Sequence, residues 1–130
     1  MKARWDLYDN FEKREFDCKR TGRNNMQHEF MVGLQQLRHE YGLPIVVNSG
    51  YRDPTHPVEA AKKLGPGVHT LGIAADIAVD RGNAYRLIYL AIKIGFTGIG
   101  VKQHGVVRFI HLDMAESTPY RIRPTIWSYR

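Results

Sequence analysis

The clearest periodic pattern in the chain is an apolar stripe between positions 26 and 41. Its members recur at steps of four, four, three and four residues: Met26, Phe30, Leu34, Leu37 and Tyr41. This spacing predicts an α-helix that packs by one side. Asn24 or Asn25 can cap its start. Gly42 suits the left-handed position after the last turn, and Pro44 prevents continuation.

Two further helices are predicted downstream. Pro57 can occupy the first position of a short helix that runs through Lys63. The loop that follows, Leu64 to Gly67, leads to His69. A longer helix starts after a turn at Asp80 to Asn83 and ends at a glycine. Its inward face and its end are Leu87, Leu90, Ala91, Ile94 and Gly95.

Strand patterns alternate with these helices. Ile45 to Val47 is a short β-branched run of the kind found in central strands. From Ile73 to Val79 inward and outward positions alternate, which places Asp76 on the face opposite Ile77. Segments 98–102 and 106–113 are expected to form a hairpin.

The order helix, strand, strand, helix, strand, strand predicts an α+β fold in a single domain, residues 1–130. We expect a small, mainly antiparallel sheet with helices packed on one face. Residues 1–25 would form an N-terminal packing segment of short helical pieces. Residues 116–130 would form a basic C-terminal tail that Trp127 packs down.

Composition and charge narrow the class of protein. The chain has 130 residues, 43% hydrophobic and 25% charged, as in a globular domain. No apolar run reaches the ~20 residues of a membrane span. Cys18 is the single cysteine, which excludes an intrachain disulfide and a cysteine zinc cluster. We expect a monomer. The net charge of +6 permits attraction to an anionic envelope, whereas specific nucleic-acid binding would rest on charge alone.

A candidate metal site centres on Asp76. Its strand neighbours Ala74 and Ala78 leave space around a carboxylate that is costly to bury unless a positive charge meets it. His69, at the end of the preceding loop, and His111, on a later strand, can share a metal ion with it. Two histidines and one aspartate leave room for water, as catalytic zinc sites do, since structural sites are closed by four protein ligands.

The same residues carry a resemblance to a known family. The pattern His-x-x-Gly-x-Ala-x-Asp from His69, followed by His-x-Asp from His111, resembles the zinc D-Ala-D-Ala carboxypeptidase and L-Ala-D-Glu endopeptidase family, which includes phage lysins and the hedgehog domain. Ser49 to Arg52 resembles the family's Ser-Gly-Tyr-Arg turn. Gly98 to Val101 resembles its glycine-rich strand, and 123–129 resembles the closing segment of one branch. The likeness extends over about residues 11 to 129.

This resemblance implies a hedgehog/D-Ala-D-Ala-peptidase-like fold and a Zn²⁺ ion bound by His69, Asp76 and His111. It implies hydrolysis of peptidoglycan stem or cross-link peptides, by a D,D-carboxypeptidase, an endopeptidase or an L-Ala-D-Glu endopeptidase. A basic chain that begins without a signal peptide suits a phage-type endolysin, made in the cytoplasm and released by a holin into the periplasm and cell wall. The alternative is a non-catalytic zinc-binding domain of a phage structural or assembly protein.

Three more residues are candidates for catalysis. Arg52 would bind a substrate carboxylate or the developing oxyanion, or else form a structural salt bridge. Several relatives carry an acid three positions before the second histidine, where this chain has Arg108. Asp113 shares the strand face of His111 and is the first choice for the general base. Glu59 is the second choice for the base. Asp113 could instead orient His111 or an arginine. Glu59 could instead hydrogen-bond and position a residue of the site, or complement the dipole of its helix.

The remaining histidines are expected to be peripheral. His28 and His39 fall outside the apolar stripe of the first predicted helix, so we expect both to be exposed. His104 lies at the tip of the predicted hairpin. A histidine in such a loop is normally solvated, although this one could reach the cleft.

Overall fold

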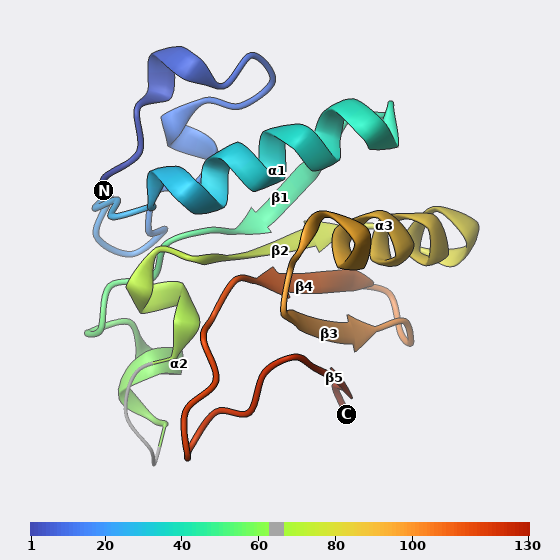
Figure 1. Ribbon diagram of the computed structural model, residues 1–130. Coiled ribbons are helices and arrows are strands. Elements are labelled where there is room, and N and C mark those ends of the chain that lie inside the picture. Colours follow the sequence, from blue (N-terminus) through green and yellow to red (C-terminus); the bar gives the residue numbers. More distant parts are fainter. Residues whose placement is uncertain (63–66) are drawn as a thin grey trace.

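The computed structural model describes residues 1–62 and 67–130, and its centre is a five-stranded mixed sheet (Figure 1). The strands lie in the order β1-β2-β4-β3-β5. The pair β3–β5 is parallel and the other neighbours are antiparallel. The strands are β1 (Val46–Ser49), β2 (Ala74–Ala78), β3 (Gly98–Lys102), β4 (Phe109–Asp113) and β5 (Thr125–Ser128). The predicted α+β class with a mainly antiparallel sheet is confirmed.

Two long helices, α1 (His28–Tyr41) and α3 (Arg81–Ile94), pack against each other on one face of this sheet (Figure 1). The strand residues that join them in the core are Ala75, Ile77, Ile99, Ile110 and Leu112. All five members of the predicted stripe between positions 26 and 41 are buried in the same core. Burial of this apolar surface is the main force that holds the helices to the sheet.

The ends of the helices agree only in part with the sequence. Gly42 and Gly95 adopt the left-handed conformation after α1 and α3, as expected. The predicted cap of α1 is wrong, because Gln27 holds the cap position without a side-chain hydrogen bond. Asn24 instead accepts a hydrogen bond from the backbone N–H of Met26 at 2.9 Å, and so stabilises the turn before the helix.

Shorter elements border the other side of the sheet. They are α2 (Pro57–Ala60), η3 (Val68–Leu71) and the C-terminal tail that carries β5 (Figure 1). Pro57 opens α2 as predicted. The predicted extension of this helix through Lys63 is wrong, because α2 ends at Ala60 and the described residues Ala61 and Lys62 are not helical. Positions 63–66, which include the predicted loop from Leu64, lie outside the described residues. His69 is carried by η3 and therefore faces the same side of the sheet as the tail.

Two strand predictions need correction. The run at Ile45 to Val47 was expected in the centre of the sheet, but β1 is an edge strand and Val46 is 58% exposed. β-Branched residues fit any pleated, half-buried surface, so they do not distinguish an edge from a centre. The last strand of the hairpin begins at Phe109 rather than Val106, since Val106 and Val107 are exposed in the connection.

The N-terminal segment contains two 3₁₀ turns, η1 (Trp5–Leu7) and η2 (Lys13–Glu15). Tyr8, Phe11 and Phe16 of this segment are buried in the core. The hydroxyl of Tyr8 lies 2.6 Å from Nδ1 of His28, so the expectation that His28 is exposed is wrong, whereas His39 is exposed. None of the helices in the described part of the chain is long and apolar enough to cross a membrane.

The register of the sheet aligns one row of residues on the side away from α1 and α3. Asp76 pairs with His111, His111 pairs with Gly100, and Gly100 pairs with Trp127. Directly paired residues project to the same face, so this row places an acid, an imidazole and an indole together with a gap at the glycine. A Cβ at Gly100 would lie 2.9 Å from the Trp127 ring, which explains why glycine occupies that position.

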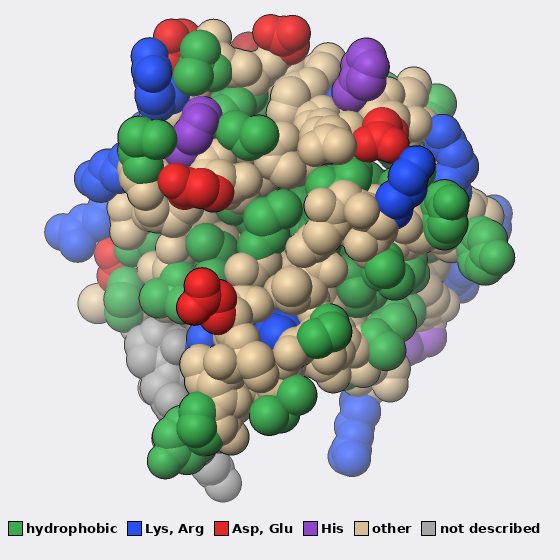
Figure 2. Space-filling model, viewed as in Figure 1, with side chains coloured by type: hydrophobic (Ala, Val, Ile, Leu, Met, Phe, Trp, Pro, Cys, Tyr) green, Lys and Arg blue, Asp and Glu red, His purple; other side chains and the backbone are tan. Residues whose placement is uncertain are grey.

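Charged side chains are mixed on the face seen in Figure 2. Lys and Arg side chains lie mainly around its edge, separated by acidic, apolar and uncharged groups. On this face the basic side chains are therefore scattered rather than gathered into one stripe. A closer grouping of basic side chains lines the cavity described next.

Candidate metal centre

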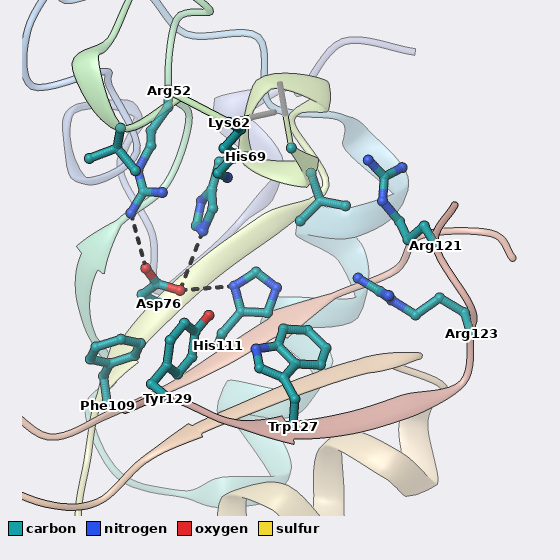
Figure 3. A pocket seen from close by; sticks show the side chains of 13 residues that line it. Arg52, Lys62, His69, Asp76, Phe109, His111, Arg121, Arg123, Trp127 and Tyr129 are labelled. Atoms are coloured by element: carbon teal, nitrogen blue, oxygen red, sulfur yellow. Dashed lines mark hydrogen bonds and ion pairs between the residues drawn. The ribbon is translucent and has the colours of Figure 1, made fainter. Parts of the chain in front are cut away.

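His69, Asp76 and His111 meet on the side of the sheet opposite the long helices (Figure 3). One carboxylate oxygen, Oδ1 of Asp76, lies 3.4 Å from His69 Nε2 and 3.0 Å from His111 Nδ1. One ligand atom from each residue lies within 4.8 Å of the others, and all three residues are buried. The structure thus brings together the three side chains predicted as metal ligands.

Each imidazole is oriented by a hydrogen bond at its outer nitrogen. His69 Nδ1 lies 2.7 Å from the carbonyl oxygen of Gly50 and donates to it. His111 Nε2 lies 2.8 Å from Oδ2 of Asp113. These acceptors hold a proton on the outer nitrogen of each ring, so that His69 Nε2 and His111 Nδ1 can direct lone pairs toward Asp76.

The electrostatic environment keeps the carboxylate ionised. Burial raises the pKa of Asp76, but hydrogen bonds with His111 and His69 outweigh burial and hold that pKa well below its usual range. Burial lowers the pKa of His111, whereas Asp113 and Asp76 raise it more strongly. A proton on His111 Nδ1 and a metal ion compete for the same lone pair, so metal binding would release a proton. Two nitrogens and one anionic oxygen, with the outer nitrogens satisfied, fit a zinc ion with an open position.

Asp113 lies behind His111 rather than in the cavity. Its side chain is completely buried and accepts hydrogen bonds from Arg123 Nε at 3.0 Å and Arg123 Nη2 at 2.8 Å. It also accepts from His111 and from the backbone N–H of Ala115 at 3.1 Å. A carboxylate so enclosed has no access to a substrate or its attacking water. This enclosure favours the orienting role, which the sequence also allowed, over the role of general base.

Replacing Asp113 with asparagine should weaken zinc binding by about tenfold, near the lower end of the range for an outer hydrogen-bond partner. An amide oxygen still accepts from His111, but the charge that favours the outer proton is lost. Titration of the protein with zinc against a competing chelator measures the change. Asp17→Asn, which removes a carboxylate that pairs with Lys13 and does not line the cavity, is the control and should leave the affinity unchanged. Equal affinities in both variants would show that Asp113 does not orient the ligand.

Glu59 also lies outside the cavity and holds other side chains in place. Its buried carboxylate accepts from Arg52 at 3.1 Å, from Lys62 at 3.0 Å and from the backbone N–H of Gly67 at 2.8 Å. Burial raises the pKa of Glu59, but these donors outweigh it and lower the pKa. Glu59 therefore stays ionised and engaged, which speaks against its assignment as a proton acceptor.

Arg52 is positioned between this acid and the candidate metal ligands. One of its terminal nitrogens binds Glu59, and the other lies 3.4 Å from Oδ2 of Asp76 (Figure 3). The guanidinium also lines the cavity. The predicted structural salt bridge is present. Arg52 also presents a cation to the cavity, and its contact with a substrate carboxylate or oxyanion stays a prediction.

The cavity has a volume of about 420 Å³ and is open to solvent on one side. Its walls contain the three candidate ligands, Arg52, and four side chains of the C-terminal tail: Arg121, Arg123, Trp127 and Tyr129. Within residues 1–62 and 67–130, Asp76 is the one carboxylate among the lining residues. His104 is exposed in the β3–β4 connection, 3.3 Å from the carbonyl oxygen of Tyr129, and does not line the cavity.

Sequence reasoning missed Arg121 and underestimated Tyr129. From Arg121 to Tyr129, every second residue is partly buried and the residues between them are exposed. The sequence does not signal this alternation, because Ile122 and Ile126 are exposed whereas Arg121 and Arg123 are partly buried, the reverse of the usual hydrophobic pattern. Burial raises the pKa of Tyr129, so its hydroxyl stays protonated near neutrality and can donate a hydrogen bond into the cavity.

Residues 7–113 match the model of a protein family described as Peptidase M15. The matched region includes the three candidate ligands, Arg52, Glu59 and Asp113, and it ends before the tail. No curated protein matches the chain.

Proposed function

The chain belongs to the peptidase M15 family of zinc-dependent metallopeptidases, and from this premise we propose that it hydrolyses the stem or cross-link peptides of peptidoglycan. The observation that carries the proposal is the buried group of His69, Asp76 and His111 at the wall of a solvent-open cavity. The bond cleaved would be that of a D,D-carboxypeptidase, an endopeptidase or an L-Ala-D-Glu endopeptidase.

His69, Asp76 and His111 would hold the zinc ion. The chemistry that zinc supplies in such a site is activation of a water for attack and polarisation of the scissile carbonyl. Arg52 lies beside Asp76 and can stabilise negative charge that develops on the carbonyl oxygen. The protonated hydroxyl of Tyr129 offers a second donor from the opposite side of the cavity. Glu59 holds Arg52 in position for this role.

In the same proposal the protein is a phage-type endolysin. It would be made in the cytoplasm and would reach the periplasm and cell wall after holin-mediated release. The net charge of +6 supports attraction to the anionic envelope.

A second candidate function is a zinc-binding domain without turnover, for example in a phage structural or assembly protein. One observation favours it. In the part of the chain that the structure describes, Glu59 and Asp113, the two candidate proton acceptors, are buried and paired with arginines. Among those residues, Asp76 is the one carboxylate that lines the cavity, and it is a candidate metal ligand. Measured turnover separates the two functions.

We expect the zinc-loaded protein to clear suspensions of permeabilised bacteria, and expect a strong chelator to stop this and added zinc to restore it. Mass spectrometry of the digested muropeptides would identify the bond that is cut. His69→Ala should be inactive, and His39→Ala, which changes an exposed histidine on α1, should be fully active. A protein that binds zinc tightly and leaves every muropeptide intact would establish the non-catalytic alternative.

A further inference from the structure

Four cationic side chains line the cavity from two walls (Figure 3). Arg52 and Lys62 lie on one wall, and Arg121 and Arg123 lie on the other. Three of these cations have a buried acidic partner, since Arg52 and Lys62 bind Glu59, and Arg123 binds Asp113. The remaining cation is Arg121.

Arg121 has no acidic partner within residues 1–62 and 67–130, and its guanidinium makes no hydrogen bond there. The undescribed positions 63–66 contain no Asp or Glu in the sequence. The backbone of Arg121 is nevertheless fixed, because its N–H and C=O bond those of Thr118 at 3.1 and 2.7 Å. The fold thus holds a partly buried guanidinium at the cavity wall without a carboxylate partner in the described residues, so its donors are available to an anionic ligand.

We propose that Arg121 binds a carboxylate of the substrate, and that the preferred substrates are peptides with a free carboxylate close to the scissile bond. This inference rests on the proposed peptidase function. A guanidinium matches a carboxylate with two parallel N–H donors, and the pairing is strongest where water is partly excluded. Arg121 lies beyond residue 113, where the family match ends, so it belongs to the part of the cavity built by this chain's own tail.

The charge around the cavity supports an anionic ligand. Four cations of the wall face one carboxylate in the cavity and the two buried acids behind it, so an excess of positive charge remains. A zinc ion at the candidate ligands would increase this excess. The carboxylate could be the C-terminus of the peptide or the α-carboxylate of a γ-linked glutamate, and matched substrates distinguish the two.

The test compares stem peptides that differ in one group. One pair carries a C-terminal carboxylate or a C-terminal amide, and the other carries a free or an amidated glutamate α-carboxylate. For the wild-type protein we expect kcat/KM to be about 10- to 100-fold higher for the acid of one pair, the range of a charge-assisted hydrogen bond. Arg121→Ala should abolish this preference by raising KM for the acid alone. Arg121→Lys should retain part of it.

Arg130→Ala is the matched control, because it removes an exposed arginine from the same tail outside the cavity, and it should keep the full preference. The inference is overturned if the wild-type protein cleaves acid and amide equally, or if Arg121→Ala slows both alike. Dissociation constants for peptides N-methylated at each candidate scissile amide test Arg121 without turnover. One outcome is that the protein cleaves none of the peptides and still binds the acid more tightly than the amide, with Arg121→Ala losing this difference. That result would refute the proposed peptidase function but support Arg121 as a carboxylate-binding residue.

Discussion

Replacing Asp76 with asparagine is expected to lower zinc affinity on the order of a thousandfold and to abolish peptidase activity. Oδ1 of Asp76 lies within 3.4 Å of the inner nitrogens of both His69 and His111, so it is the shared centre of the candidate site. An amide of the same shape lacks the negative charge that offsets the metal's own. Removing one charge from a buried, paired group costs about 4 kcal/mol, which corresponds to this factor.

The measurement is a competition titration with zinc, together with metal analysis of the purified variant. Asp80→Asn is the control, because Asp80 is an exposed carboxylate four residues downstream whose side chain makes no capping bond to α3. It should bind zinc as the wild-type protein does. If Asp76→Asn binds one zinc ion with unchanged affinity, the zinc site lies elsewhere in the protein.

The sequence predicted the side of the sheet on which the candidate site lies because strand periodicity is a local property. Alternation from Ile73 to Val79 placed Asp76 opposite Ile77, and the structure has Ile77 in the core beneath the helices. The apolar stripe before Gly42 predicted α1 in the same way. Side-chain types at fixed spacing were therefore enough to identify the three residues that meet.

The pairing of charges could not be predicted, because it depends on segments that meet only after folding. The sequence offered Asp113 as the first choice and Glu59 as the second choice for the general base. The structure shows that each is enclosed by an arginine, Arg123 from ten residues downstream and Arg52 from seven residues upstream. Strand β5 was missed for a related reason, since its parallel pairing with β3 requires the tail to fold back along an edge of the sheet.

Replacing Gly98 with alanine is expected to weaken zinc binding by about a hundredfold although no polar group is removed. Gly98 lies directly opposite Asp113 in the β3–β4 pair, and an added Cβ would overlap both carboxylate oxygens of Asp113. That carboxylate cannot retreat, because Arg123 and the N–H of Ala115 hold it from other directions. Either the two strands separate or Asp113 leaves His111. The free energy of unfolding should also fall by about 1–3 kcal/mol, as in other overpacked sites.

Gly82→Ala is the matched control for this prediction, since it adds the same methyl group where no atom lies within 4 Å. Gly82 is in the first turn of α3, so alanine should leave zinc affinity unchanged and raise the free energy of unfolding by up to about 1 kcal/mol. Zinc titration and denaturant unfolding of both variants separate a local effect on His111 from a general loss of stability. If Gly98→Ala is destabilised but binds zinc normally, Asp113 does not control His111. If it loses zinc more strongly than Asp113→Asn does, the position of the carboxylate matters more than its charge, because the methyl group moves the acceptor whereas the amide leaves it in place.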